Sequence, residues 1–498
     1  FCTLLEQRCD IFSAMAKTSK FRHARAQTAK PDSHFLNVSP TTAIWDCGNF
    51  MACNSKYIAV PWHLSGSTAI LRHDQHGKLP NTLPVLTGHA GPVIDLTFSP
   101  FNDNILFTGS EDATIRGWRI PEGGLTANES SPIVELRGHS KKVGILAFHP
   151  SAENVLASAS MDNSIHLWDV TTESAKATLK GFTSEQILSL NWNLDGSLLN
   201  VTTRDKKLSI LDSRSGSVVA TTDSHQGSKN QRSVWAKRKN LIVTVGFDKS
   251  QRREVMVWDC RNLTKAIKAE EIDQASSVMM PFYDEDTSML YIGSKGDGTI
   301  RYYELTSEAP TLLACSTFAT ADPAKGLAIM PKRCLDVKQC EIARFYFLGA
   351  KSLYPLRMIL PRKQSEVEFQ EDVYVPTFAS EPAMTCSEFF DEKKNAEPKV
   401  MDLRGLFDGS ACHVTETVPS RVSAEPAAQP MFSPVRDASP SLVDDAEVEE
   451  RRQALNVATQ RVVELRAELA AAEQEFQRCE TELASLIATK SQTTTSQQ

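Results

Sequence analysis

Short apolar runs alternate with turn residues along much of the chain, and between residues 88 and 169 this pattern occurs twice in succession. Each copy contains a first apolar run (93–98, then 143–148), a second run (104–107, then 154–157) and a third run that alternates up to a Trp. Runs of four to six β-forming residues with turn residues between them predict strands. One small sheet cannot bury both of its faces alone, so the pattern predicts sheets packed against copies of themselves.

Four side chains keep the same spacing in both copies. After the His of a Gly-His pair, an Asp follows at 23 residues and a Trp at 29, with a Ser or Thr on the strand between them. The two sets are His89, Thr108, Asp112 and Trp118, and His139, Ser158, Asp162 and Trp168. We expect a hydrogen-bond chain in each copy, in which the Asp accepts from the His and the Trp indole N–H finds an acceptor. A catalytic His–Asp pair would occur once, whereas a scaffold bond recurs, so we predict structural roles and no catalytic residue.

The repeat continues in weaker form on both sides of this pair. One unit precedes it (41–73), two later units keep the 23-residue interval (Phe182 to Asp205, His225 to Asp248), and two more follow (around Tyr303, and 340–360). In the unit of His225 the Trp comes four residues late, at Trp258. Seven units predict an all-β, seven-bladed WD40 β-propeller over residues 17–360. The extended segment 21–26 is expected to complete the last blade and remove an exposed edge.

The composition changes after residue 378. Residues 379–444 are rich in Pro, Ala, Ser and Glu, which predicts a disordered linker. Its Ser-Pro pairs at Ser433 and Ser439 fit phosphorylation sites and equally fit ordinary linker sequence. Over residues 445–490 apolar residues recur every seven positions, which predicts a C-terminal α-helical coiled coil, followed by a disordered tail at 491–498.

Charges beside the coiled-coil seam indicate the direction of its helices. The seam includes Leu455, Val462, Leu465, Leu469, Phe476, Leu483 and Leu486. In a parallel, in-register pair, Arg461 would face Arg466 and Glu475 would face Glu480, and both pairs repel. An antiparallel pair brings the basic end of one helix against the acidic end of the other, and each such charge pair stabilises the arrangement by about a few tenths of a kcal/mol. We therefore predict a homo-oligomer, a dimer or a tetramer, through an antiparallel coiled coil.

Composition narrows the chemistry. The 498 residues carry a net charge of −7 and are 41% hydrophobic and 23% charged, which is ordinary for globular proteins. The chain contains no run of 18 apolar residues, so we expect no transmembrane segment. The 11 cysteines form no CxxC pair, which favours reduced cytoplasmic thiols over disulfides or zinc. Without a Gly-rich phosphate loop or metal-ligand spacing we expect no cofactor and no metal. Residues 1–16 lack the features of a signal peptide, so we expect a non-native or disordered N-terminal extension.

A basic segment lies near the start of the chain. Between residues 17 and 31 there is no acid, and the cations include Lys20, Arg22, Arg25 and Lys30. On a chain of net negative charge this segment fits a contact surface for an acidic partner, because complementary charge speeds and orients association. A solvated terminal strand with ordinary charge scatter fits it equally well.

Several phrases of the sequence are more specific than the repeat itself. They are residues 19–23 (Ser-Lys-Phe-Arg-His), 100–103 (Pro-Phe-Asn-Asp), 138–144 (Gly-His-Ser-Lys-Lys-Val-Gly), 281–287 (Pro-Phe-Tyr-Asp-Glu-Asp-Thr), 340–346 (Cys-Glu-Ile-Ala-Arg-Phe-Tyr) and 369–372 (Phe-Gln-Glu-Asp). In these phrases, across residues 19–378, the chain resembles the coronins, which are WD40-propeller proteins that bind filamentous actin and carry a C-terminal coiled coil.

The resemblance implies a cytoplasmic, non-enzymatic protein of the actin cytoskeleton that bundles filaments and regulates their assembly and turnover, with the branched-actin nucleation machinery as a further partner. It also implies that residues 361–378 pack back on the propeller, and it implies no nucleic-acid partner. Two positions depart from the family: Asn37 stands where a basic residue linked to actin binding is common, and Arg466 stands where a trimer motif has Glu. The alternative is a general WD40 scaffold that recruits partners other than actin.

Overall fold

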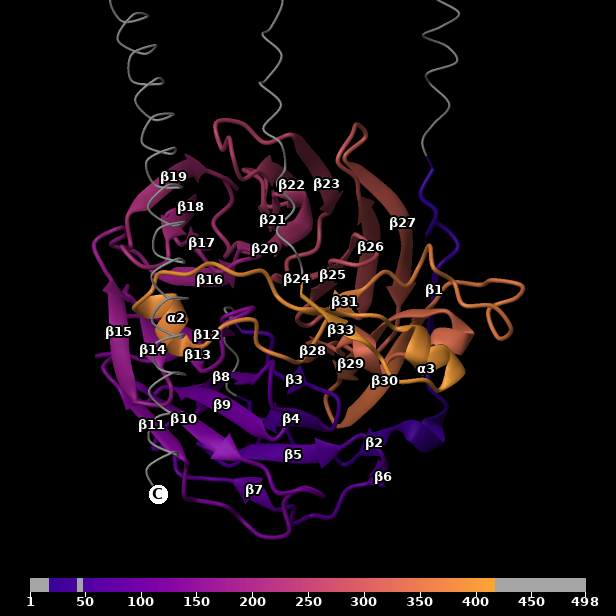
Figure 1. The fold of residues 1–498 in the computed structure, drawn as a ribbon, viewed down its shortest axis with the longest axis horizontal. Coiled ribbons are helices and arrows are strands. Elements are labelled where there is room, and N and C mark those ends of the chain that lie inside the picture. The colour runs from indigo at the N-terminus through magenta and orange to yellow at the C-terminus, as the bar shows by residue number, and fades with distance from the viewer. Residues whose placement is uncertain (1–17, 43–47, 417–498) are drawn as a thin grey trace, which may run out of the picture. The chain divides into compact units, whose positions relative to one another are not determined.

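The computed structural model describes residues 18–42 and 48–416. In this part of the chain, seven mainly antiparallel sheets surround a common centre as the blades of a β-propeller (Figure 1). The innermost strands of successive sheets contact one another around the ring. The prediction of repeated small antiparallel sheets is thus confirmed.

Six blades have four strands each, and in every one the innermost strand comes first along the chain. They are β3 (Ala52–Cys53), β4 (Tyr57–Pro61), β5 (Thr68–Arg72) and β7 (Val85–Leu86); β8 (Val93–Phe98), β9 (Ile105–Ser110), β10 (Thr114–Arg119) and β11 (Val134–Arg137); β12 (Val143–Phe148), β13 (Val155–Ser160), β14 (Ile165–Asp169) and β15 (Ser174–Leu179); β16 (Ile187–Trp192), β17 (Leu198–Thr203), β18 (Lys207–Asp212) and β19 (Val218–Asp223); β20 (Arg232–Ala236), β21 (Leu241–Phe247), β22 (Arg253–Asp259) and β23 (Lys268–Asp273); and β24 (Met279–Asp284), β25 (Met289–Ser294), β26 (Thr299–Leu305) and β27 (Leu312–Ala319).

The seventh blade has a different origin, because it combines both ends of the propeller. It contains β28 (Gly326–Ile329), β29 (Glu341–Leu348), β30 (Ser352–Ile359), β1 (Arg25–Thr28), β2 (Phe35–Leu36) and the short β6 (Gly77–Lys78). Short 3-10 turns occur at Pro31–Ser33, Lys237–Lys239, Lys332–Cys334 and Val337–Gln339.

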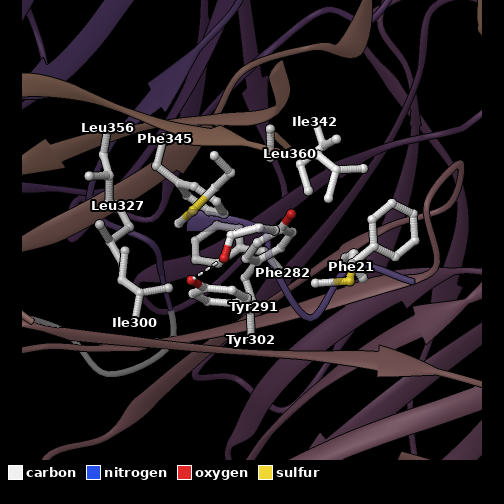
Figure 2. Close-up of a cluster of buried hydrophobic side chains, with 14 of the residues drawn as sticks. Phe21, Phe282, Tyr291, Ile300, Tyr302, Leu327, Ile342, Phe345, Leu356 and Leu360 are labelled. Atoms are coloured by element: carbon white, nitrogen blue, oxygen red, sulfur yellow. Dashed lines mark hydrogen bonds between the residues drawn. The ribbon is translucent and has the colours of Figure 1, made fainter. Parts of the chain in front are cut away.

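Burial follows the position of a strand within its blade. The second strands β13 and β21 are buried along their whole length, because their sheets pack between two others. The outer strand β19 is largely exposed. One apolar cluster lies between the sixth and seventh blades (Figure 2), where the rings of Tyr291 and Phe345 meet edge to face at 5.1 Å. The core is therefore made between blades rather than within them.

The N-terminal segment joins the last blade, but at a later position than the sequence indicated. β1 pairs antiparallel with β30 in the register Arg25 to Ile359, so the strand begins at Arg25 rather than near residue 21. The residues before it turn instead, and Phe21 is fully buried in the cluster of Figure 2. The hydroxyl of Tyr302 donates to the carbonyl of Ala24 at 2.9 Å. Residues 21–24 therefore anchor the segment by burial, and the strand pairing follows.

Residues 361–416 form an extension that crosses one face of the propeller (Figure 1). It contains β31 (Thr377–Phe378), α2 (Cys386–Phe390), β32 (Val400–Met401), α3 (Arg404–Asp408) and β33 (Val414–Thr415), and the three strands pair as one small sheet. Tyr374 is buried, and its hydroxyl donates to the carbonyl of Glu341 at 2.9 Å.

The prediction of disorder from residue 379 is wrong as far as residue 416. Met384 forms a bridge with Ala152, and Phe389 is fully buried against the propeller. A capping box of Thr385 and Glu388 begins α2. A few widely spaced anchors hold this polar segment, and its average composition does not reveal them.

Some predictions fall outside the described residues. These are the start of the first blade at 44–46, the linker after residue 416, and the coiled coil with its seam residues. Among the described residues, no helix has the length and apolar character to span a bilayer.

Candidate functional site

The repeated side chains lie inside their blades as closed hydrogen-bond chains. In the second blade, His89 Nδ1 lies 2.9 Å from Asp112 Oδ2 and His89 Nε2 lies 2.8 Å from Thr108 Oγ1. The indole N–H of Trp118 donates to the same Thr108 oxygen at 2.9 Å. Since Nδ1 donates to the carboxylate, Nε2 can accept from the threonine hydroxyl, which in turn accepts from the Trp. The other carboxylate oxygen of Asp112 accepts from the backbone and the hydroxyl of Thr114, so the polar groups of the chain are satisfied.

The third blade repeats this arrangement. His139 Nδ1 lies 3.0 Å from Asp162, His139 Nε2 lies 2.7 Å from the hydroxyl of Ser158, and the indole of Trp168 donates to that hydroxyl at 2.8 Å. Burial raises the pKa of Asp162, but the hydrogen bonds from His139 and from Ser164 outweigh it and hold the pKa well below its usual range. A Cβ at position 138 would lie 3.0 Å from the Trp168 ring, which accounts for the Gly before the His.

A third chain differs from the one that the spacing indicated. His225 Nδ1 lies 2.8 Å from Glu254 rather than bonding to Asp248, while Thr244 and Trp258 take the usual places at 2.9 Å each. Asp248 instead accepts from the backbone and side chain of Arg252. The longer turn carries the Asp away, and a Glu at the start of β22 replaces it. The late Trp258 was the one signal of this change.

These buried chains do not provide a reactive site. The side chains of His89 and His139 are each 1% exposed and are engaged through both ring nitrogens. In the described ranges, no group of three or more His, Cys, Asp or Glu side chains is arranged to hold a metal ion. The geometry stabilises the blades.

The basic segment presents its cations outward because the residues between them point inward. Ser19, Phe21 and Ala24 are buried. The four cations Lys20, Arg22, Arg25 and Lys30 are exposed. Lys20 donates to the carbonyl of Asp372 in the extension at 2.8 Å, and Arg22 donates to the carbonyl of Ser19 at 3.2 Å. The alternation fixes the direction of these side chains on the rim of the seventh blade.

Lys30 also lines a cavity of about 460 Å³ at this rim, which sequence reasoning missed. Its other lining residues include His73 and His76 from one distant stretch and the cations Arg344 and Arg357 from another. Arg344 and Arg357 share the buried carboxylate of Glu341, with contacts of 2.7 and 3.0 Å, and Arg357 also lies 3.4 Å from Asp336. Two carboxylates therefore face three permanent cations, so the cavity keeps an excess positive charge that the repeat pattern does not predict.

Asn37 lies beside this rim in a left-handed conformation, with φ of 64°. Its amide donates to the carbonyl of Leu79 at 3.1 Å and to Asn81 at 3.2 Å. Asn tolerates this backbone region better than most residues. Asn37 thus holds the turn before the first blade, and the cations of the rim come from other segments.

The extension also contacts the propeller at the third and fourth blades. The ring of Phe389 lies 4.4 Å from that of His149 and 4.3 Å from the guanidinium of Arg214, whose Nε also donates to the Phe389 carbonyl at 3.0 Å. Burial lowers the pKa of His149 to about 3. α2 therefore seats on the third and fourth blades through an aromatic anchor.

Comparison with known protein families gives matches along most of the described chain. A domain of unknown function (DUF1899) matches residues 14–78, the WD domain, G-beta repeat matches 80–119 and 130–169, the anaphase-promoting complex subunit 4 WD40 domain matches 177–250, and a type of WD40 repeat matches 353–398.

Individual proteins give a more specific result. Coronin-A of Dictyostelium discoideum is 45% identical over 397 residues, which cover 79% of this chain and 87% of that protein. The WD40 domain of Toxoplasma gondii coronin superposes with a TM-score of 0.71 at 34% identity, over 76% of this chain and 97% of that domain. A chain of the mitotic checkpoint complex, at 17% identity and a TM-score of 0.51 over 68% of this chain and 94% of its own, shares the fold alone. On the strength of the first two, this chain belongs to the coronin family.

Proposed function

We propose that this protein binds filamentous actin through the cationic rim of its seventh blade, and that it has no enzymatic activity. The observation that carries the proposal is that Ser19, Phe21 and Ala24 are buried, while the cations of the same segment, Lys20, Arg22, Arg25 and Lys30, are exposed. Membership of the coronin family supports actin as the acidic partner. The protein then acts in the cytoplasm on the actin cytoskeleton.

Co-sedimentation with actin filaments across a salt series tests the electrostatic part. Reversing the four cations together to Glu should weaken binding by about tenfold or more at low salt, because complementary charges set much of the encounter rate. Raising the ionic strength should weaken actin binding by the unmodified protein, since about 0.1 M salt screens exposed charges beyond roughly 10 Å.

The matched control reverses four exposed lysines elsewhere on the propeller: Lys141, Lys180, Lys249 and Lys265. This control has the same net charge as the test variant and should keep most of the binding. Equal losses in both variants would show a non-specific charge effect and would end the assignment to the seventh blade.

We further propose that an antiparallel coiled coil at residues 445–490 joins propellers into a dimer or tetramer that bundles filaments and regulates their assembly together with the branched-actin nucleation machinery. Linked binding modules raise the effective concentration of the second contact. A chain stopped at Asp444 should bind single filaments but lose bundling and oligomer mass in light scattering. Bundling that survives this truncation would contradict the proposal.

A general WD40 scaffold is the second candidate, and Asn37 favours it, because the family's basic position here serves a turn. Folded protein that recovers other partners but no actin in pull-downs would support the scaffold over the actin-binding function.

A further inference from the structure

A second cavity, of about 480 Å³, lies where the inner strands β12, β16, β20 and β24 end beneath β31 of the extension. Its volume falls in the roughly 300–1,000 Å³ range of small-molecule sites. Neither the buried hydrogen-bond chains nor the cationic rim uses it.

Part of the wall of this cavity is aromatic and apolar, beside polar and charged lining residues. It includes Phe148, Leu190, Trp192, Trp235 and Phe378. The indole N–H of Trp192 donates to the carbonyl of Ala147 at 3.0 Å. The indole N–H of Trp235 is buried and has no acceptor within residues 18–42 and 48–416. Such a donor costs free energy unless an acceptor reaches it.

Most of the charged groups around the cavity are already engaged. The ion pairs are Lys332 with Asp284, Arg238 with Asp286, and Arg333 with Asp103. The carboxylate of Glu285 accepts from the backbone N–H groups of Lys237 and Arg238 at 2.7 and 3.2 Å. The acidic side chains that line the cavity are thus satisfied without the ammonium of Lys237.

The side chain of Lys237 differs from its neighbours. The residue is half-buried, and its ammonium has no hydrogen bond or ion pair in the part of the chain that the structure describes. Lys237 lines the cavity together with Thr377 and Phe378 of the extension, and Glu285 is the opposite charge that acts on it. Burial lowers the pKa of Lys237, and the attraction of the nearby Glu285 carboxylate offsets this only in part.

We propose that this cavity binds a small planar aromatic anion, a carboxylate or a phosphate monoester. The ring packs against the indoles of Trp192 and Trp235, and the anionic group lies on the ammonium of Lys237. An aromatic part of the wall beside an ammonium without a direct ion pair suits this class of ligand, because the ammonium attracts an anionic group, gives a neutral ring no charge contact and repels a cationic ring. The site is separate from the proposed actin surface.

Isothermal titration of the full-length protein tests the proposal, with 2-naphthoate and 2-naphthyl phosphate as anionic probes and 2-naphthamide as the neutral one. We expect saturable binding of one anionic probe per chain, at least about tenfold tighter than the amide, which corresponds to roughly 1.4 kcal/mol. Lys237→Met should remove this preference and leave amide binding unchanged. The better of the two anionic probes identifies the anionic group.

Lys239→Met is the matched control, because this lysine lies on the same 3-10 turn but does not line the cavity. It should bind both anions as the unmodified protein does. Thermal unfolding provides the fold check: the preferred anion should raise the melting temperature of the unmodified protein and of Lys239→Met, but not of Lys237→Met. Absence of saturable binding, equal affinity for anion and amide, or equal losses in the two lysine variants would each overturn the proposal.

Discussion

The second and third blades differ from the seventh in how they are held together. In the former, one hydrogen-bond chain joins residues that are 10 to 23 positions apart, as from Trp118 to Thr108 and from His89 to Asp112. In the latter, strand pairing joins the two ends of the propeller, as between Arg25 of β1 and Ile359 of β30. Local chains stabilise one blade each, whereas the distant contacts close the ring.

Regular spacing in the sequence therefore does not show how much a contact contributes to the stability of the fold. The local chains show in the sequence because each blade needs the same geometry. The closure of the ring is hard to recognise in the sequence, because it occurs once and depends on the burial of single residues such as Phe21. We therefore expect the less regular region to be the more sensitive to substitution.

Phe21→Ala tests this expectation with the largest effect. Removing a fully buried Phe from the cluster of Figure 2 should lower the free energy of unfolding by about 3–5 kcal/mol. Urea unfolding followed by fluorescence measures it. Arg22→Ala, one residue away and exposed, is the control and should unfold close to the unmodified protein. A Phe21→Ala protein with an unchanged midpoint would show that the ring closes without this anchor.

Substitutions in the hydrogen-bond chains should lower the free energy of unfolding by a smaller amount. Asp162→Ala and Glu254→Ala each leave a buried His without its acceptor, which should cost about 2–3 kcal/mol of unfolding free energy. Asp248→Ala should cost clearly less, because that Asp pairs with Arg252 in a turn at the surface and leaves no buried His without an acceptor. If Asp248→Ala instead destabilised the protein as much as Glu254→Ala in urea unfolding, the acceptor of His225 would be Asp248, as the 23-residue spacing indicates, rather than Glu254.

The sequence predicted the propeller well for a physical reason. Alternating apolar runs and a recurring His, Asp and Trp reflect local geometry, and local geometry leaves a periodic pattern. The same reasoning placed the final strand four residues too early, because residues 21–24 form a turn that anchors the segment through the buried Phe21 and Ala24.

Other features could not be predicted because their partners are distant. Phe389 lies in a polar stretch, and its burial depends on His149 and Arg214 from two blades. The cavity beside Lys30 likewise combines His73 and Arg344, which no local spacing connects. Glu254 was missed because a longer turn moved the expected Asp away.

His149 connects the two kinds of stabilisation, because a local side chain here supports a distant segment. Its Nδ1 accepts from the backbone N–H of Ala152 at 2.8 Å, and its ring packs on Phe389. An accepting Nδ1 and a buried ring both require the neutral imidazole. Burial accordingly lowers the pKa from its ordinary value of 6.5 to about 3.

The smallest predicted effect is therefore a pH dependence. Because the folded pKa of His149 is below the unfolded one, the unfolded state binds more protons, so the contribution of His149 is complete above pH 6.5 and is lost as the pH falls towards 3. One unit below the unfolded pKa, near pH 5.5, the loss should be about 1.4 kcal/mol. Urea unfolding of the unmodified protein at pH 8 and at pH 5.5 should show this loss of unfolding free energy. In His149→Asn the change in unfolding free energy between the two pH values should be smaller by the same amount. His166, whose pKa burial lowers to about 4, remains in both proteins and cancels in the comparison. An unchanged difference in His149→Asn would mean that the ring does not stay neutral beneath α2.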